Sequence, residues 1–504
     1  MNKKIIILII SIIGFAPLTS CGSSSSVADD DGGSNNNNNQ NNNGNNNNSS
    51  RKTTTYTTNI TGLYSLTKSS SDVIEGSNAS ENNIEILPSQ TYQTMDGFGA
   101  AITYSTAYNL LNMSKENRTK FLKETFSDTE GYGFSYVRVS IGCSDFSSKE
   151  YTCCDTKGLD NFSLQSDDNN YVIPILKEIL AINPNVKVMG SPWTCPKWMK
   201  VEDLESKLPH DKWTDGHLNP DLYQTYSDYL VKWIKAYNDA GIPIYSITPQ
   251  NEPLNKGNCA SLYMPWEEES ALLKVLVPTF KKEGLKTKIY AYDHNYDQYS
   301  YPLNVYNDIK GIDGEDIVAG AAFHNYLGSE SILDNMYSAR PDKGLVFTET
   351  SIGTWNNGRS LKDRLLDDME HVALGTVNRY CTAVIVWNLM LDTNMGPNLA
   401  GGCQSCYGAV DINTSDYKTI SRNSHYYILA HLSSVVKPGA VRLGFSSSSY
   451  KNNDIIYSAF KNSDGTYAVV IINKANTQRS VIVSDGQNET KLLLPATSIV
   501  SAKW

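Results

Sequence analysis

Two glutamates in this chain each come at the end of a short apolar stretch that is typical of a β-strand. Glu252 stands in YSITPQNE, after Asn251 and before Pro253, and Glu349 stands in GLVFTET. A proline so soon after a strand makes the chain leave the sheet, because its nitrogen cannot donate a ladder hydrogen bond. We therefore expect both carboxylates where a strand ends and a loop begins.

Two carboxyl groups that flank one bond are what glycoside hydrolysis requires. One must carry a proton for the leaving oxygen, and the other must be ionised to attack or stabilise the anomeric carbon. Carboxylates at strand ends are also often solvated or paired with a cation, so their spacing alone is weak evidence for catalysis. The interpretation depends on whether the fold brings Glu252 and Glu349 together.

The scaffold is predicted by eight apolar runs that alternate with helical patterns. A doubly wound open sheet is the alternative, but the glycine fingerprint that cradles phosphates in such sheets is absent. Eight strand–helix units in succession predict an α/β fold, a (β/α)8 TIM barrel, whose working face lies at the strand C-termini. Strands four and seven then face each other across the mouth. The expected strands are residues 96–103, 135–142, 186–193, 245–252, 288–294, 317–326, 344–350 and 383–389.

The C-terminal part has a different pattern. Alternating apolar runs joined by Asp464-Gly465 indicate antiparallel hairpins, hence a small β-sandwich packed beside the barrel. The stretch near residues 84–89 is expected to add a strand to it. The expected domains are N-terminal sandwich strands in residues 59–93, the barrel in residues 94–423 and the C-terminal sandwich in residues 424–504.

The N-terminus has the features of an export signal. Lys3 and Lys4 precede a short apolar run, so residues 1–20 read as a signal peptide that is too short for a membrane span. The LTSC ending resembles the bacterial lipobox, which implies a lipid on Cys21; a plain signal peptide with an incidental cysteine is the alternative. We expect residues 21–58, rich in Ser and Asn, to form a flexible tether.

These features predict an exported bacterial lipoprotein held at the outer membrane, on its cell-surface or periplasmic side, by the lipid anchor only. The net charge of −10 is spread along the chain, which argues against nucleic acid as a partner. The 31 tyrosines and 8 tryptophans suit a protein that handles sugars, although such residues also fill cores. We expect a monomer.

The cysteines raise the question of a metal. Cys403 and Cys406 stand in a C-x-x-C pattern, but no second pair follows at the spacing of a zinc site. An exported protein can form disulfides, so a disulfide or buried free thiols are favoured over zinc. Hydrolysis by two carboxyl groups requires no metal and no organic cofactor, and we expect none.

Seven motifs identify a resemblance to a known family. They resemble glycoside hydrolase family 30, which includes acid glucosylceramidases and β-1,6-glucanases, over roughly residues 84 to 504. The resemblance implies a retaining double displacement with Glu252 as general acid/base and Glu349 as nucleophile. The motifs, in order, are DGFGAAIT, YVRVSIGCSDFS, MGSPWTCPKWMK, TPQNEP, AAFHNYLG, FTETSIG and VWNLMLDTNMGPN.

The resemblance also implies roles for other residues at the mouth. His324 and Tyr326 would orient the nucleophile, Arg138 would keep it ionised, and the peptide bond after Trp387 would be cis. Structural roles remain possible for Trp193, His324 and Arg138, and Asp293 and His294 stay unassigned. The residues implied to bind the sugar next to the scissile bond are Asp145, Trp193, Asn251, Trp387 and Asn398.

The segment after Glu252 bears on the substrate. PLNKGN is compact and polar and looks more like the β-1,6-glucanase branch than the glucosylceramidases, which need an apolar surface for a lipid tail. We therefore expect an endo-β-1,6-glucanase. An exo-acting β-glucosidase or a glucosylceramidase-like enzyme is the alternative within the class. A non-catalytic glycan-binding lipoprotein is disfavoured, because both glutamates are present.

Overall fold

The computed structural model describes residues 51–75 and 83–504. The predicted signal peptide, the predicted lipidation at Cys21 and residues 21–50 of the predicted tether lie outside the described residues. Within the described ranges, no helix combines the length and the apolar character that a membrane crossing requires.

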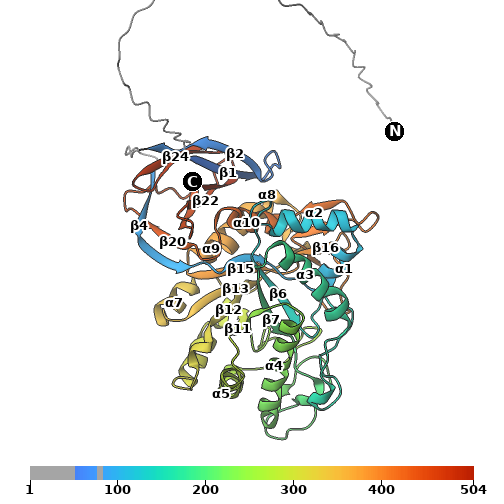
Figure 1. The fold of residues 1–504 in the computed structure, drawn as a ribbon. Helices are drawn as coiled ribbons and strands as arrows, with labels where there is room; N and C mark the ends of the chain where they lie inside the picture. The colour runs from blue at the N-terminus through green and yellow to red at the C-terminus, as the bar shows by residue number, and fades with distance from the viewer. Residues whose placement is uncertain (1–50, 76–82) are drawn as a thin grey trace, which may run out of the picture. The chain divides into compact units, whose positions relative to one another are not determined.

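Eight parallel strands form the barrel, and consecutive strands along the chain are neighbours (Figure 1). The last strand pairs with the first, and a parallel bridge between Ala101 and Arg138 joins the first to the second. Each strand overlaps one of the eight expected runs, so the predicted TIM barrel is confirmed. The strands are β5 (Gly97–Ala100), β6 (Tyr136–Ile141), β7 (Lys187–Pro192), β10 (Ile244–Ile247), β11 (Lys288–Asn295), β12 (Val318–His324), β13 (Gly344–Glu349) and β15 (Cys381–Val386).

Most of the helices cover the outside of the barrel and bury one apolar face against it. In α4 the buried stripe includes Tyr226, Trp233 and Tyr237, at helical spacing. Gly190 of β7 lies directly beneath it, where a Cβ atom would come within 2.6 Å of the Trp233 ring. The helices are α1 (Tyr104–Asn112), α2 (Lys115–Phe126), α3 (Ile173–Ile182), α4 (Tyr223–Asp239), α5 (Trp266–Lys282), α6 (Ser300–Asp308), α7 (Ile332–Ala339), α8 (Leu361–Asp368), α9 (Gly375–Val377) and α10 (Ser424–Val435).

The second domain is a mainly antiparallel sandwich around its own core, as predicted. Strand β4 starts parallel to β23 and then pairs with β20, so it passes from one layer to the other. Side chains of both layers, among them Ile84, Val469 and Leu494, fill the space between them. The strands are β1 (Lys52–Asn59), β2 (Thr67–Asp72), β3 (Ile74–Glu75), β4 (Asn83–Thr94), β20 (Val441–Phe445), β21 (Ile455–Lys461), β22 (Tyr467–Asn473), β23 (Arg479–Ser484), β24 (Asn488–Leu494) and β25 (Ser498–Lys503).

Short strand pairs brace the loops beyond the barrel strands. They pair β8 with β9, β14 with β17, and β18 with both β16 and β19. Their bounds are β8 (Lys200–Val201), β9 (His217–Leu218), β14 (Ile352–Gly353), β16 (Met390–Asp392), β17 (Cys406–Tyr407), β18 (Val410–Ile412) and β19 (Ile420–Arg422).

Two expected domain boundaries are wrong. Residues 52–58, assigned to the tether, form most of β1, which lies between β2 and β25. The run KTTTYTTN is rich in β-branched residues, which favour a strand, whereas the Ser/Asn-rich composition ends before it. Residues 424–435, assigned to the sandwich, form helix α10, whose residues are all buried between β5 of the barrel and β22 and β25 of the sandwich (Figure 1).

Candidate active site

A pocket of about 360 Å³ opens at the C-terminal ends of the barrel strands. This is the face on which TIM barrels carry their active sites, and the volume suits a small ligand. Its lining combines carboxylates, amides and aromatic rings. The lining residues are Asp145, Trp193, Glu252, Asn255, Asn258, His294, Asn295, Tyr326, Leu327, Glu349, Ser351, Trp355, Trp387, Cys403 and Cys406.

The two glutamates meet in this pocket. Glu349 ends β13, and Glu252 follows β10 in a turn where it adopts a left-handed φ of 46°. Both are buried, and a carboxylate oxygen of one lies within 4.8 Å of a carboxylate oxygen of the other. This separation is close to the roughly 5 Å of retaining glycosidases and well below the roughly 6.5–9.5 Å of inverting ones.

Glu349 accepts two hydrogen bonds from side chains below and beside it. Arg138 donates from Nη1 at 2.6 Å, and the Tyr326 hydroxyl donates at 3.0 Å. Burial raises the pKa of Glu349, the positive charges of His324 and Arg138 oppose that rise, and the nearby Glu252 adds to it. The predicted contacts of Arg138 and Tyr326 with Glu349 are thus present.

Glu252 is surrounded by donors. Asn255 and Asn258 donate their side-chain amides to one oxygen at 2.8 and 2.9 Å, and His324 Nδ1 lies 3.3 Å from the other. Burial acts to raise the pKa of Glu252, but His324, aided by His294 and Asn255, outweighs it and lowers the pKa to about 2. These neighbours therefore favour the carboxylate form of Glu252.

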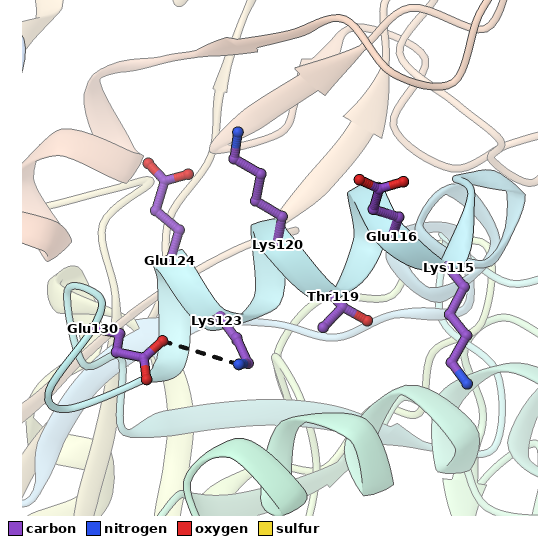
Figure 2. A pocket seen from close by; sticks show the side chains of 7 residues that line it. All are labelled: Lys115, Glu116, Thr119, Lys120, Lys123, Glu124 and Glu130. Carbon is purple, nitrogen blue, oxygen red and sulfur yellow. Dashed lines mark ion pairs between the residues drawn. The ribbon is translucent and has the colours of Figure 1, made fainter.

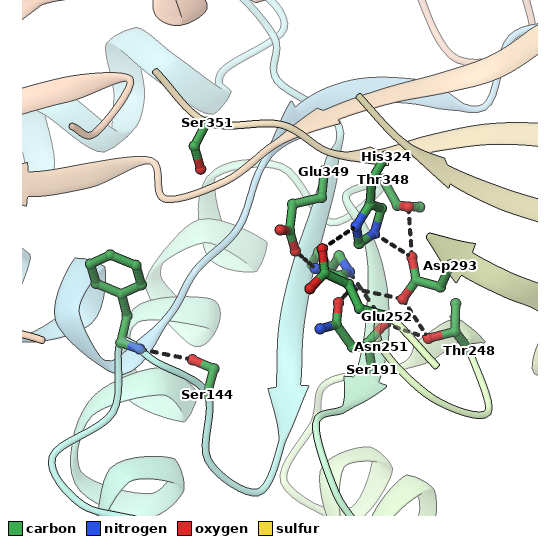
Figure 3. Close-up of polar contacts among 12 residues, drawn as sticks. Ser144, Ser191, Thr248, Asn251, Glu252, Asp293, His324, Thr348, Glu349 and Ser351 are labelled. Carbon is green, nitrogen blue, oxygen red and sulfur yellow. Dashed lines mark hydrogen bonds and ion pairs between the residues drawn. The ribbon is translucent and has the colours of Figure 1, made fainter. Parts of the chain in front are cut away.

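A buried aspartate links these two environments. Asp293, left unassigned from the sequence, accepts from Arg138 Nη2 at 2.7 Å and from the hydroxyls of Thr248 and Thr348 at 2.8 and 2.7 Å (Figure 3). Its other close neighbour is His324 Nε2, 3.0 Å away. The role predicted for His324, orienting the nucleophile, stays a prediction. Its ring lies between Asp293 and Glu252, and its positive charge acts on Glu349.

Strand β11 bulges to place Asp293 there. Tyr292 and Asp293 both adopt left-handed backbone conformations, with φ of 77° and 60°, where the register against β12 shifts. The carboxylate of Glu269, on α5, accepts a hydrogen bond from the Tyr292 N–H at 3.0 Å. Such a bulge redirects side chains: Asp293 lies beneath the site while His294 lines the pocket.

The charges of this cluster balance when its carboxyl groups hold one proton. Arg138 is cationic. Burial lowers the pKa of His324, but the negative charges of Glu349 and Asp293 raise it by more, so the pKa of His324 rises to about 9. Two cations face the three carboxyl groups of Asp293, Glu252 and Glu349. One proton on the Glu252–Glu349 pair makes the cluster neutral, and at their separation the two titrate as a coupled pair.

Three of the sugar-binding residues predicted from the sequence, Asp145, Trp193 and Trp387, line the pocket. Trp193 and Trp387 stack with ring centroids 5.1 Å apart, and the Arg138 guanidinium lies over both rings. Asp145 lines the same pocket; its removal from bulk water, with Glu349 nearby, raises its pKa to about 8. Asn398 does not line the pocket: its side chain donates to the Met395 carbonyl at 2.8 Å.

Asn251 lies beside the catalytic pair in a fixed orientation. Its side-chain oxygen accepts from Arg138 Nη2 at 2.7 Å, and Figure 3 shows its amide nitrogen directed away from the guanidinium. The predicted cis bond after Trp387 is wrong, because Gly396–Pro397 is the cis peptide among the described residues. The chain turns at Asn388 through a left-handed φ of 50° instead.

Cys403 and Cys406 form a disulfide that lines the pocket, which is one of the two states favoured over zinc from the sequence. Within the described ranges, Glu252, His324 and Glu349 are the group whose potential ligand atoms lie close enough for a metal ion. Arg138 donates to Glu349, and the raised pKa of His324 favours the imidazolium, so added positive charge there would be repelled. We assign these residues no metal.

Several pocket residues were given no role from the sequence, although each lies at or after the end of a predicted strand. The sequence signal for these residues was their position near a strand end. That position does not show which loop side chains point into the pocket. The missed lining residues are Asn255, Asn258, His294, Asn295, Leu327, Ser351 and Trp355.

A second pocket lies along α2 and shares no lining residue with the catalytic pocket. Figure 2 shows its long lysine and glutamate side chains pointing in different directions, with an ion pair between Lys123 and Glu130 at 4.0 Å. Both members of that pair are mostly exposed. Mixed, solvated charges of this kind hold no group in a reactive state, so we assign this groove no site.

The domains match two family models. The glycosyl hydrolase family 30 TIM-barrel domain matches residues 95–436, and the glycosyl hydrolase family 30 beta sandwich domain matches residues 439–502. The boundary between them falls just after α10, in agreement with the packing of that helix against the barrel.

Solved and curated relatives cover nearly the same span. A solved endo-β1,6-glucanase is 57% identical with a TM-score of 0.86, covering 90% of this chain and 99% of that chain. An endo-1,6-β-D-glucanase of Trichoderma harzianum is 31% identical over 442 residues, 83% of this chain and 86% of that protein. The endo-1,6-β-D-glucanase of Neurospora crassa is 31% identical over 458 residues, 86% and 91% of the two chains.

Proposed function

The chain belongs to glycosyl hydrolase family 30, and we propose that it is a retaining endo-β-1,6-glucanase that cleaves bonds within β-1,6-glucan chains. The observation that carries this proposal is the buried pair of Glu252 and Glu349, with oxygens within 4.8 Å across one sugar-sized pocket. The similarity to endo-1,6-β-glucanases over most of their length supports the linkage.

The first step forms a glycosyl-enzyme ester. A carboxylate oxygen of Glu349 attacks the anomeric carbon while the bond from that carbon to the glycosidic oxygen breaks. Glu252 gives its proton to the departing oxygen, which leaves as a sugar hydroxyl, and becomes a carboxylate. Arg138 and Tyr326 hold Glu349 in place for this attack through the two hydrogen bonds that it accepts.

The second step reverses these roles. Glu252, now ionised, takes a proton from a water molecule whose oxygen attacks the anomeric carbon, and the ester bond to Glu349 breaks. Glu349 leaves as a carboxylate, and the proton is again on Glu252. Two inversions at the same carbon return the original β configuration.

The proton of the coupled pair must lie on Glu252 when the first step begins. The protein donors around Glu252 favour its carboxylate form, and burial favours the proton on Glu349. A bound sugar changes both preferences: the glycosidic oxygen accepts a hydrogen bond from protonated Glu252, and the positive charge that develops on the anomeric carbon stabilises ionised Glu349. The substrate itself thus sets the reactive protonation state.

Asn251 supplies a further transition-state contact. Because Arg138 occupies its oxygen, its amide nitrogen is left as a donor toward the 2-hydroxyl of the bound sugar. Hydrogen bonds at this hydroxyl strengthen as the anomeric carbon becomes cationic. Trp193 and Trp387 provide the aromatic wall against which the sugar ring packs.

The chemistry of the pocket favours a polysaccharide over a glycolipid. Asn255, Asn258 and Asn295 line the side that carries the general acid and separate its apolar side chains, so this side lacks the continuous apolar surface that a ceramide would require. A binding-only role is disfavoured because the network around Glu252 and Glu349 holds both carboxyl groups in catalytic geometry. An exo-acting β-glucosidase is the remaining alternative, and the products distinguish it.

The purified chain is expected to degrade β-1,6-glucan into a mixture of β-configured oligosaccharides, with far lower rates on β-1,3-glucan, β-1,4-glucan, xylan and glucosylceramide. Chromatography of early products tests the mode of cleavage, and proton NMR of the newly formed reducing ends tests the stereochemistry. Glucose as the sole early product would indicate exo action instead. Preference for glucosylceramide, or an initial α product, would contradict the proposal.

We also propose that the chain is exported and held at the outer membrane by a lipid on Cys21. The support is the sequence alone: Lys3, Lys4, the apolar run and the LTSC ending. The full-length protein is expected in the membrane fraction and in the detergent phase after phase separation, whereas Cys21→Ser moves it to the aqueous phase. Equal partitioning of the two proteins contradicts the anchor.

A further inference from the structure

Trp355 differs from the other tryptophans that line the pocket. Trp193 and Trp387 are 2% and 3% exposed, whereas Trp355 is 54% exposed at the rim of the same pocket. A large apolar ring left in water beside a polar pocket is a common mark of a binding surface. Trp355 takes no part in either step of the hydrolysis.

The exposed ring is held firmly by its surroundings. Trp355 lies in a short 3-10 turn (Thr354–Asn356) directly after β14, and β14 pairs with β17, which begins at the disulfide-bonded Cys406. The Thr354 N–H donates to the Ser405 carbonyl at 3.0 Å. The ring covers Gly353, where a Cβ atom would lie only 2.0 Å from Cζ3 of the indole. Trp355 therefore cannot occupy this position unless residue 353 is glycine.

The barrel order places Trp355 on the side of the leaving group. The loops after β15, β6 and β7 carry Trp387, Asp145 and Trp193, which form the wall for the sugar that reacts. The loops after β10, β12 and β13 carry Glu252, Leu327 and Trp355 on the other half of the mouth, and the loop after β15 reaches Trp355 from the neighbouring position through β17. Because Glu252 protonates the departing oxygen, the departing sugar must lie on its half.

We propose that Trp355 is the stacking platform for the glucosyl unit on the leaving-group side of the scissile bond, with exposed Leu327 extending the apolar surface. The apolar face of a pyranose ring lies on the indole while its hydroxyls face water and the neighbouring amides. This inference rests on the proposed endo-glucanase function and names a residue that selects for a sugar leaving group. Holding the ring in advance lowers the entropy lost on binding.

Two substrates separate this role from a structural one. A β-1,6-linked gluco-oligosaccharide places a sugar on Trp355, whereas β-glucosyl fluoride fills the pocket and has no leaving-group sugar. Trp355→Ala is expected to lower kcat/KM for the oligosaccharide roughly tenfold, the loss of about one aromatic contact. It should leave kcat/KM for the fluoride unchanged, and Trp355→Phe should retain most activity on both.

Gly353→Ala provides a second test, because the new methyl group would lie 2.0 Å from the indole and 2.5 Å from the Ser405 carbonyl, so the ring must move although it is still present. It is expected to reproduce the selective loss, while Leu63→Ala, at a 77% exposed position in the sandwich domain, changes neither rate. Equal losses on both substrates, or no loss on the oligosaccharide, overturn the assignment of Trp355. If the wild-type enzyme hydrolyses the fluoride but no β-1,6-linked oligosaccharide, the proposed function itself fails.

Discussion

Glu349→Ala is expected to lower kcat on β-1,6-glucan by at least about 10⁴-fold, because it removes the nucleophile and with it the covalent intermediate. The space it leaves lies beside the anomeric carbon, between Arg138 and Tyr326, whose hydrogen bonds to the carboxylate are lost. Azide can enter that space and attack an activated β-glucoside. The product, identified by NMR, should be a glucosyl azide of inverted, α configuration.

Glu349→Asp is the matched control. It keeps the charge and the ion pair with Arg138 but shortens the side chain by one methylene, so the attacking oxygen stands farther from the anomeric carbon. We expect activity between that of the wild type and Glu349→Ala. Unfolding curves that match the wild type show whether the barrel is intact. Wild-type turnover by Glu349→Ala, or an azide product of retained configuration, rules out Glu349 as nucleophile.

Glu252→Ala should give a different kinetic pattern. Loss of the general acid slows departure of a sugar hydroxyl by orders of magnitude, whereas fluoride leaves without protonation. The second step loses its base on every substrate, so the glycosyl-enzyme accumulates and activated substrates show a burst followed by slow turnover. Added azide attacks this intermediate and yields the β-glucosyl azide, the opposite anomer to that from Glu349→Ala.

The pH profile gives a second measure of the same residue. In the wild type, kcat/KM for β-1,6-linked oligosaccharides should fall at high pH, because Glu252 then loses the proton that it must donate. This alkaline decline should be absent from Glu252→Ala with β-glucosyl fluoride. Glu252→Gln, of similar shape, is the control for packing. A slow first step on both classes of substrate would show that Glu252 is not the acid.

The elements that carry the site were predictable because they are encoded locally. Each barrel strand is a short apolar run between turn residues, and the spacing of Tyr226, Trp233 and Tyr237 places them on one face of α4. Glu252 and Glu349 could be placed at strand ends for the same reason. Composition was a poorer guide to boundaries, since β1 begins inside the expected tether and α10 packs against both domains.

The partners of these residues could not be predicted in this way. Position placed His324 at the mouth, but only the bulge of β11 brings Asp293 between it and Arg138. Asn255 looked like part of a polar loop, and its bond to Glu252 depends on the turn at Glu252 itself. Asn398 is the last residue of a matching motif, yet its side chain folds back onto its own loop.

By itself, the sequence determined that eight strands would form and that two carboxyl groups would stand at the ends of the fourth and seventh, because periodicity and turn residues act over a few neighbouring positions. Only the closed barrel decided which atoms meet. The ion pair of Arg138 with Glu349 joins residues 211 positions apart, and a separation of a few ångströms across such a distance depends on every strand between them.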